Sequence, residues 1–534
     1  MKIQHLTLQE TGRFSQLICD YVANDNRLTS FFSHYPTLEN FKEQITVKSK
    51  HFTKEARSVL SAVLEKQYEV LPHSKISSNQ LLLLKKENTF TVTTGHQLSL
   101  MTGPLYFIIK IACTINLCKQ LKVAYPKYNF VPLYWMASED HDFEEISSFQ
   151  FRDKKFHWNK ESTAAVGSLV LDDLLPVLNV FETHLGNHPE VNTIKEWIKG
   201  SYRTAKDLSE ATFRLVHALF GDEGLLVLEP NVKELKAYFK PILEDELKTN
   251  ASYTYVIKQI KDIKDTYDKK YIPQVNPREI NLFYLTPHGR YRIEKKDEKY
   301  ALIGTEKHFS KAEFFELLDA HPERFSPNVI LRPVYQELIL PNLCYIGGAG
   351  EIAYWLQLKE NFDRLKIPFP MLLVRNSVLL YSQKTAKKME KLKLTPSDLF
   401  LKRTALINKK IKEFSSVNLD LGFLKEQLKE QFKYLHSLVA QTDPSFEGAV
   451  SAQEKKQTKG IQHLEKRLLK AQKRVRSDQV ERLELLHNEL FPADQLQERS
   501  LNFTAFHLET NGQLIPLLLK SVQPLQSDFT LIEY

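Results

Sequence analysis

Short hydrophobic segments alternate with longer amphipathic ones between residues 88 and 375. The short segments are rich in β-branched and aromatic residues, which predicts strands, and the long ones repeat apolar positions every three or four residues, which predicts helices. This alternation favours an α/β fold with a mostly parallel sheet covered by helices. Strands are expected at 89–94, 129–136, 225–229, 328–332, 343–347 and 370–375, and helices at 104–124, 192–219, 231–247, 253–269, 311–320 and 350–365.

The pattern changes after about residue 383, where strand signals disappear and leucines recur among charged residues. Two leucine seams, over 421–438 and 461–490, have coiled-coil spacing, and the second seam shifts by one position after Val475. A loop at 442–448 would let them fold as an antiparallel hairpin that ends at Pro492. The expected domains are a core at 1–382 with insertions at 148–325, a helical coiled-coil arm at 383–491, and a short β-rich return to the core at 492–534, from segments 502–509 and 514–522.

Composition excludes a disordered chain, because 42% of the 534 residues are hydrophobic and 11% are aromatic. The net charge of +8 leaves a nucleic-acid partner open. Residues 384–490, however, carry 23 Lys and Arg against 14 Asp and Glu, so this arm holds +9 and the rest of the chain −1. Lys and Arg beside a leucine seam are typical of solvated coiled-coil flanks, so no nucleic-acid partner is expected.

Four cysteines without paired or metal-ligand spacing indicate a reducing, cytoplasmic compartment, and no zinc site is expected. Glu10 and Arg13 interrupt the start of the chain, and no run of 18 apolar residues occurs, so neither a signal peptide nor a membrane contact is expected. The P-loop, GxSxG, HExxH and CxxC motifs are absent from the sequence.

A glycine-containing turn follows the first predicted strand of the core. Gly95 would allow a turn with positive φ, and His96, Gln97, Thr102 and Gly103 follow it before a long helix. The carboxyl end of a strand is where open α/β sheets bind ligands. A surface or capping histidine is the alternative, but the two glycines and the helix start favour a binding site.

A second glycine turn lies in CYIGGAGEIAYW, between a predicted strand and a predicted helix. Gly348, Gly350 and Ala353 match the G-x-G-x-x-A form of the dinucleotide motif. The alternative is a tight turn that only packs the helix on the strand. Glu351 would repel a phosphate, so a substrate amine or hydroxyl fits equally well. The candidate residues are Gly347, Gly348, Gly350, Glu351, Tyr354 and Trp355.

An acidic cluster stands at the end of the strand 129–136. Glu139, Asp140, His141 and Asp142 could hold the imidazole protonated, ligate a hard cation or bind a substrate ammonium group. The alternative is an acidic helix N-terminus that stabilises the helix dipole.

Polar residues also follow two later strands. Arg332 and Gln336 come after 328–332, and Arg375 and Ser377 come at the end of 370–375. Arginines at strand ends suit carboxylate or phosphate recognition, and surface salt bridges are the alternative.

Five segments, in this order, resemble the bacillithiol-biosynthesis cysteine ligase family, BshC. They are TGHQLSLMTGPLY (94–106), PLYWMASEDHDFEEI (132–146), RFSPNVILRPVYQE (324–337), YIGGAGEIAYW (345–355) and LQER (496–499). The family commonly has Gln where this chain has His96. The resemblance implies a Rossmann-like core with connecting-peptide insertions, related to class I aminoacyl-tRNA synthetases, and a coiled-coil arm that pairs two subunits as a homodimer.

The resemblance also implies the last step of bacillithiol synthesis, in which the carboxyl of cysteine joins the amine of glucosaminyl malate. Amide formation from a free carboxylate is uphill in water, so ATP is the expected activator and Mg²⁺ a possible helper. The expected roles are phosphate binding by Gly95 and His96, amine or metal-phosphate binding by Glu139, Asp140 and Asp142, general base catalysis by His141, sugar or nucleotide binding by the 347–351 turn with Tyr354 and Trp355, and binding of malyl carboxylates by Arg332 and Arg375.

Two other functions remain compatible with the residues. One is a nucleotidyl or acyl transferase on the same sheet, and the other is a non-catalytic coiled-coil scaffold that binds nucleic acid. The polar clusters at strand ends argue against the scaffold, which has no need of them.

Overall fold

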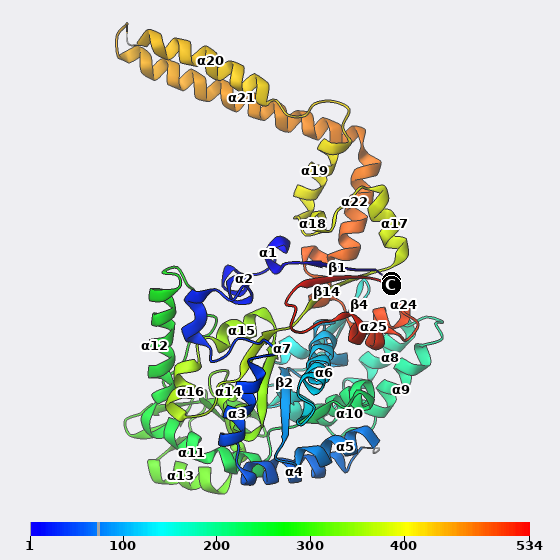
Figure 1. The fold of residues 1–534 in the computed structure, drawn as a ribbon, viewed down its shortest axis with the longest axis vertical. Helices are drawn as coiled ribbons and strands as arrows, with labels where there is room; N and C mark the ends of the chain where they lie inside the picture. Colours follow the sequence, from blue (N-terminus) through cyan, green and yellow to red (C-terminus); the bar gives the residue numbers. More distant parts are fainter. Residues whose placement is uncertain (1, 72–74, 440) are drawn as a thin grey trace.

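A five-stranded parallel sheet forms the centre of the molecule (Figure 1). The computed structural model describes residues 2–71, 75–439 and 441–534. All four pairings in the sheet are parallel, which confirms the expected Rossmann-like α/β core. In spatial order the strands are β13 (Met371–Val374), β12 (Asn342–Gly347), β2 (Thr89–His96), β3 (Asn129–Met136) and β6 (Leu226–Leu228).

The strand order reverses direction between β2 and β12. From β2 the chain proceeds outward through β3 to β6, and from β12 it proceeds outward on the opposite side to β13. Loops on either side of such a switch point diverge, which leaves a crevice at the carboxyl ends of the strands. Both glycine turns therefore meet at this crevice.

Helices cover both faces of the sheet (Figure 1). One of them is α6 (Tyr106–Ala124), which follows β2, is buried along most of its length and is apolar on nearly all sides. The helix expected at 192–219 is two separate helices in the structure, and so is the helix expected at 350–365. The core helices include α3 (Phe41–His51), α4 (Lys54–Tyr68), α5 (Lys75–Leu84), α9 (Val191–Ser201), α10 (Leu208–Phe220), α11 (Lys233–Thr249), α12 (Ala251–Thr266), α13 (Lys311–Ala320), α15 (Ala349–Trp355) and α16 (Lys359–Leu365).

Segment 148–325 holds most of the additional elements and also supplies β6 to the central sheet. Its largest unit is an antiparallel sheet that β11 completes. The order is β10 (His308–Phe309), β9 (Lys299–Leu302), β8 (Gly289–Lys296), β7 (Leu282–Thr286) and β11 (Phe325–Pro327); a separate hairpin pairs β4 (Ser148–Phe151) with β5 (Lys154–His157), before α8 (Leu175–His184).

The strand expected at 328–332 is wrong. After β11 the Asn328 side chain accepts a hydrogen bond from the backbone N–H of Ile330 at 2.8 Å, which turns the chain. Helix α14 (Arg332–Ile339) then begins, with Pro333 in its first turn. A turn residue and a helix-starting proline outweigh the β-branched residues between them.

The chain returns to the core after the arm, as expected, but the prediction of strands at 502–509 and 514–522 is wrong. Residues 502–509 and 514–522 are mostly helical, in α24 (Phe503–Glu509) and α25 (Leu514–Ser521). Asn502 caps α24 by accepting the N–H of Thr504 at 3.0 Å. The return strand comes later. It is β15 (Phe529–Glu533), which lies between β1 (Lys2–Leu6) and β14 (Ser377–Tyr381).

The helical arm projects from one end of the core (Figure 1). Its distal part is an antiparallel hairpin, as expected, with Lys425 and Glu465 paired across it at 2.6 Å. The shift in the second seam coincides with a break at Arg476, between two consecutive helices. Among the described residues, no helix is both long and apolar enough to span a membrane. The arm helices are α17 (Gln383–Lys391), α18 (Pro396–Leu399), α19 (Arg403–Phe414), α20 (Gly422–Val439), α21 (Ser445–Val475) and α22 (Ser477–Leu490).

Candidate active site

The turn after β2 differs in detail from the expectation. Gly95 belongs to the extended strand and has no positive φ. A Cβ at this position would lie 3.4 Å from the Tyr345 hydroxyl on β12, which is van der Waals contact. The left-handed conformations occur later, at Met101, Thr102 and Gly103.

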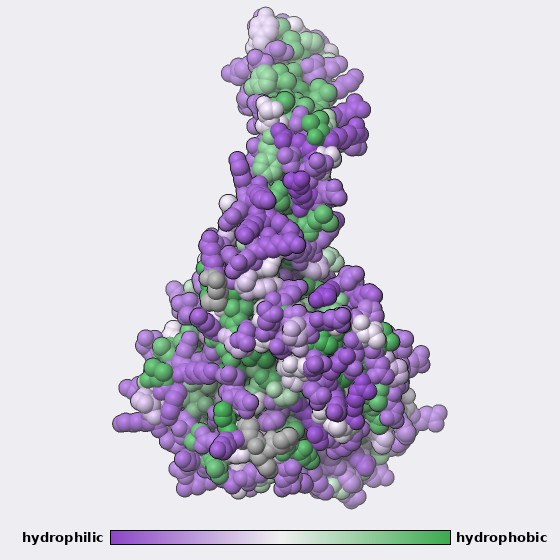
Figure 2. Space-filling view, turned by 90° about the vertical axis from the view of Figure 1, so that its right-hand side faces the viewer, coloured by the Kyte–Doolittle hydropathy of each residue, from purple (hydrophilic) through white to green (hydrophobic). Residues whose placement is uncertain are grey.

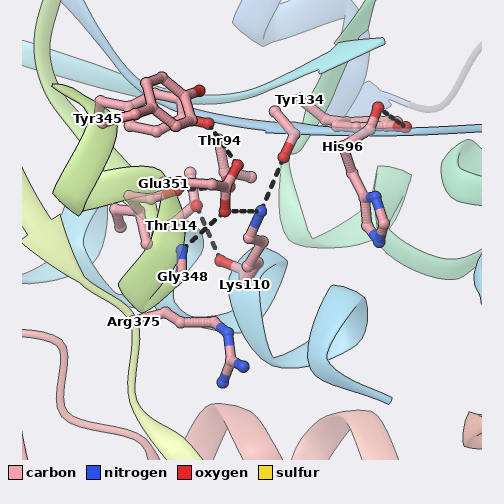
Figure 3. Close-up of polar contacts among 12 residues, drawn as sticks. Thr94, His96, Lys110, Thr114, Tyr134, Tyr345, Gly348, Glu351 and Arg375 are labelled. Atoms are coloured by element: carbon pink, nitrogen blue, oxygen red, sulfur yellow. Dashed lines mark hydrogen bonds and ion pairs between the residues drawn. The ribbon is translucent and has the colours of Figure 1, made fainter. Parts of the chain in front are cut away.

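A buried ion pair crosses the switch point (Figure 3). Lys110, on α6, contacts the carboxylate of Glu351 on α15 and donates to the backbone oxygen of Gly95 at 2.9 Å. Glu351 also accepts the N–H of Gly348 at 2.7 Å and the hydroxyl of Tyr345 at 2.8 Å. Burial would raise the pKa of Glu351, but Lys110 lowers it below its ordinary value. The Glu351 charge, which would repel a phosphate, is therefore neutralised by Lys110. The Gly348 N–H already donates to Glu351, however, so it is not free to bind a phosphate.

His96 is a neutral, buried imidazole beside this pair. It stacks on the ring of Tyr106, with 5.1 Å between ring centroids. Burial, with the positive charges of Lys110 and Arg375, lowers its pKa to about 3. Its Nε2, and the hydroxyl of Thr102, are buried without a hydrogen-bond partner among the described residues. Buried polar atoms of this kind are normally satisfied, and neither residue lines the pocket beside Asp140.

A polar pocket of about 440 Å³ opens beyond the ends of β2 and β3. Asp140 occupies its wall and is held from two sides: Gln97 donates to one carboxylate oxygen at 2.6 Å, and Arg290 donates to the other at 3.1 Å. The guanidinium also lies over the ring of Phe283, 4.1 Å from its centroid. Arg332 lines the same pocket.

Asp140 is an ionised carboxylate in this setting. Burial alone would raise its pKa, but the hydrogen bond from His141, the charge of Arg290 and the hydrogen bond from Gln97 together lower it well below its usual range. The Nδ1 atom of His141 lies 3.5 Å from Asp140 Oδ1 and 3.3 Å from Arg290 Nη1. The carboxylate, the imidazole and the guanidinium thus form one cluster at the pocket wall.

The other two members of the acidic cluster have structural partners. Glu139 pairs with Lys236 of α11 at 2.6 Å, in a buried position. Asp142 caps the short helix α7 (Phe143–Ile146) by accepting the N–H of Glu145 at 3.3 Å. Glu139 still lines the pocket, whereas Asp142 does not.

Arg332 connects the pocket to the second glycine turn, because it donates to the Tyr354 hydroxyl at 3.2 Å. Gly347, Gly348 and Gly350 lie at the end of β12 and the start of α15. Trp355 is buried and stacks on Tyr345. Gln336 is also buried and donates to Glu337 at 3.0 Å, so its amide belongs to the core rather than to the pocket.

Arg375 is held by the C-terminal part of the chain. Its two terminal nitrogens donate to the carboxylate of Glu498 at 2.8 and 2.9 Å, and both side chains are buried. Ser377 is a weaker partner of the same guanidinium, at 3.4 Å. The other face of Arg375 lies over the Tyr106 ring, which in turn stacks on His96.

Four side chains that shape the site were not predicted. The role of Lys110 could have been predicted from the sequence, because it is the only charged residue between positions 106 and 118 of an otherwise apolar helix. Arg290 and Lys236 lie in the long segment between β3 and β12, where their sequence neighbours are ordinary charged residues. Glu498 lies in the LQER segment, whose charges could equally face solvent.

The described part of the chain contains no group of three or more His, Cys, Asp and Glu side chains placed to hold a metal ion.

Comparison with known proteins agrees with this architecture. Residues 1–376 match the family description "Bacillithiol biosynthesis BshC, N-terminal Rossmann-like domain", and residues 378–534 match "Bacillithiol biosynthesis BshC, C-terminal coiled-coil domain". Relatives named "Putative cysteine ligase BshC" include one from Flavobacterium johnsoniae, 50% identical, and one from Flavobacterium psychrophilum, 47% identical, each aligned over 99% of both chains. A third, from Cytophaga hutchinsonii, is 34% identical over 98% of this chain and 97% of its own. The chain therefore belongs to the BshC family of bacillithiol biosynthesis.

Proposed function

We propose that this chain is a cysteine ligase that joins the carboxyl group of cysteine to the amine of glucosaminyl malate. The names of the relatives support the ligase class. The observation that carries the proposal is the pocket beyond the ends of β2 and β3, where Asp140 is kept ionised and His141 stands beside it. An ionised carboxylate next to an imidazole suits the binding and deprotonation of an ammonium group.

In the proposed reaction the cysteine carboxylate attacks the α-phosphorus of ATP and displaces pyrophosphate. The amine of glucosaminyl malate then attacks the acyl carbon, an amide bond forms and AMP leaves. The proposed contacts of the nucleotide are the Nε2 of His96 and the hydroxyl of Thr102, which have no hydrogen-bond partner among the described residues. Asp140 binds the incoming ammonium, and His141, which stands beside this carboxylate, is the proposed group that takes up its proton.

Arg332 is the proposed partner of a malyl carboxylate, because its guanidinium lines the pocket and no acidic side chain of the described chain pairs with it. Arg375 is less suited, since Glu498 already neutralises it in bidentate geometry. We propose that it positions Tyr106 and His96 instead.

Pairing of two subunits through the arm is also part of the proposal. Hydrophobic side chains are visible on the surface of the distal arm in Figure 2. Phe423 and Leu464, from the two helices of the hairpin, are 59% and 57% exposed. A second arm that covered them would remove apolar surface from water.

The test is incubation of the purified chain with cysteine, glucosaminyl malate and ATP, with and without Mg²⁺, followed by mass spectrometry of thiol and nucleotide products. Bacillithiol with equimolar AMP and pyrophosphate supports the proposal. ADP and phosphate would replace the adenylate route with an acyl phosphate. Absence of thiol product under every condition would contradict ligation by this chain alone.

A further inference from the structure

A second cavity of about 440 Å³ lies at the other edge of the central sheet, beyond the end of β6. Its walls come from α4, the start of α10, the start of α11 and the segment that follows β3. Met136 lines both this cavity and the pocket beside Asp140, so the two spaces lie on opposite sides of one backbone segment. None of the candidate site residues from the sequence faces this second cavity.

Glu229, directly after β6, is fixed at the base of this cavity. Its carboxylate accepts hydrogen bonds from the hydroxyls of Ser138 and Ser209 and from the N–H of Asn231 at 2.9 Å. Its own N–H donates to Gln67 at 3.1 Å, and its carbonyl oxygen accepts from Gln67 at 2.7 Å. The carboxylate is thus held by Ser138, Ser209 and Asn231, and the backbone of Glu229 is held by Gln67, so the side chain cannot swing away to find a counter-ion elsewhere.

No cationic side chain of the described residues forms a salt bridge with Glu229, whereas the charges at the cavity rim are paired with one another. Lys66 pairs with Glu234 at 3.6 Å, and Lys206 lies 4.0 Å from Asp207. Burial raises the pKa of Glu229, and its hydrogen bonds offset only part of that effect. The carboxylate would therefore gain from a positive charge placed in the cavity.

The remaining polar and apolar groups restrict the ligand further. The side-chain oxygen of Asn231 is a buried acceptor that receives no hydrogen bond from the described residues. Val63, Phe213 and Val232 supply apolar wall. A ligand that fits must present at least two N–H donors to two acceptors, carry a positive charge and have a compact apolar body. A primary ammonium group with three donors meets these requirements.

We propose that this cavity is a binding site for a small organic cation, a primary ammonium with an apolar body, whose charged group pairs with Glu229 and donates to Asn231. The site is separate from the pocket beside Asp140 and does not depend on the proposed ligation. Its occupancy is measured without cysteine, glucosaminyl malate or ATP, so failure of one proposal leaves the other unaffected.

The test is isothermal titration of the full-length chain with benzylammonium at pH 7.5. Benzyl alcohol and benzoate serve as neutral and anionic probes with the same ring. The proposal requires benzylammonium to bind at least tenfold more tightly than either. Equal affinity for benzyl alcohol, tighter binding of benzoate, or no detectable binding of benzylammonium would overturn it.

Two variants locate the bound probe. Glu229→Gln should weaken benzylammonium binding at least tenfold, while Glu234→Gln, at the paired rim, should change it less than twofold. Val70, which lines the mouth and is 54% exposed, can be changed to Trp with Glu229 intact, and this should also weaken binding at least tenfold. Circular dichroism and the melting temperature check the fold of each variant. If Glu229→Gln does not fold, the affinity of Val70→Trp for benzylammonium tests the location alone. Unchanged affinity for benzylammonium in a folded Glu229→Gln or Val70→Trp variant would overturn the assignment of this cavity as the binding site.

Discussion

Buried Lys110 and partly buried Glu351 form an ion pair that joins helix α6 to the glycine turn after β12. The pair crosses the point where the strand order reverses, and it lies between the two turns that border the crevice (Figure 3). It therefore fixes the spacing of those turns, and removal of one partner would leave an uncompensated charge in the interior.

Lys110→Met should lower the free energy of unfolding by about 2–3 kcal/mol, because Glu351, whose side chain is 26% exposed, would lose its counter-ion in a largely buried position. The double variant Lys110→Met/Glu351→Gln should recover part of this loss. Lys119→Met is the matched control from the same helix, since its pair with Glu223 is largely exposed, and it should cost less than about 1 kcal/mol. Urea denaturation measures all three, and equal losses for Lys110→Met and Lys119→Met would contradict the structural role of the buried pair.

His96 should make the protein sensitive to acid. Its pKa is about 3 in the folded chain, against an ordinary value near 6.5, so the unfolded chain binds the proton more tightly. The associated stability is present above pH 6.5 and is lost as the pH falls from 6.5 toward 3. The loss at pH 4 is on the order of 3 kcal/mol from the shift in pKa.

His96→Gln should remove that part of the acid dependence. The free energy of unfolding of this variant, measured in urea at pH 7, 5.5 and 4, should fall with acid by about 3 kcal/mol less than that of the unchanged chain. The amide can still donate to a ligand, so turnover at pH 7.5 should stay within about fivefold. An identical decline of stability with acid in both proteins would show that His96 is not the group responsible.

Arg375 and Glu498 connect the core to the C-terminal segment. Glu498→Gln should lower the free energy of unfolding by about 3 kcal/mol, because the buried guanidinium loses its counter-charge. Glu489→Gln removes the half-exposed pair with Lys388 and should change it by less than about 1 kcal/mol. If both variants lose the same small amount in urea denaturation, the buried pair does not hold the C-terminal segment to the core.

The arm offers a test of subunit pairing. Light scattering after size-exclusion chromatography should give the mass of a dimer for the unchanged chain and of a monomer for Phe423→Glu/Leu464→Glu, since the new charges would be buried in the interface. Lys429→Glu/Lys466→Glu changes two exposed polar positions on the same helices and should remain dimeric. A monomeric unchanged chain would contradict pairing, and a dimeric Phe423→Glu/Leu464→Glu variant would exclude this surface.

Much of the fold follows from local patterns. The alternation of β-branched runs and amphipathic segments predicted five of the six expected strands, and all five belong to the central sheet. The strand at 328–332 failed because a turn at Asn328 and a helix start at Pro333 outweigh the β-propensity of Val329 and Ile330. The C-terminal helices were missed because both are short and rich in apolar residues, so neither has a polar face long enough to reveal a helical period.

Gln97 and Asp140, which the sequence offers as candidates because they follow strands, line one pocket, and their functional roles stay predictions. The partners of Asp140 and Glu139 could not be predicted, because Arg290, which binds Asp140, comes from an antiparallel sheet 150 residues away, and Lys236, which binds Glu139, comes from a distant helix. Such contacts depend on how the inserted segments fold back, and nothing local in the sequence encodes that path. The pairing of Arg375 with Glu498 could not be predicted for the same reason. The sequence suggested Arg375 as a substrate ligand, but in the structure Glu498 neutralises its charge.

The central claim is that Asp140 carries the binding of the attacking amine, and a comparison of Asp140→Asn with Asp142→Asn tests it most directly. Both changes remove one carboxylate charge from the same turn, but only Asp140 lines the pocket, and Asn at position 142 can still cap its helix. With cysteine, glucosaminyl malate and ATP, Asp140→Asn should reduce the rate of bacillithiol formation at least about 100-fold, and Asp142→Asn should stay within about fivefold. A folded Asp140→Asn variant with a rate close to that of the unchanged chain would contradict the account.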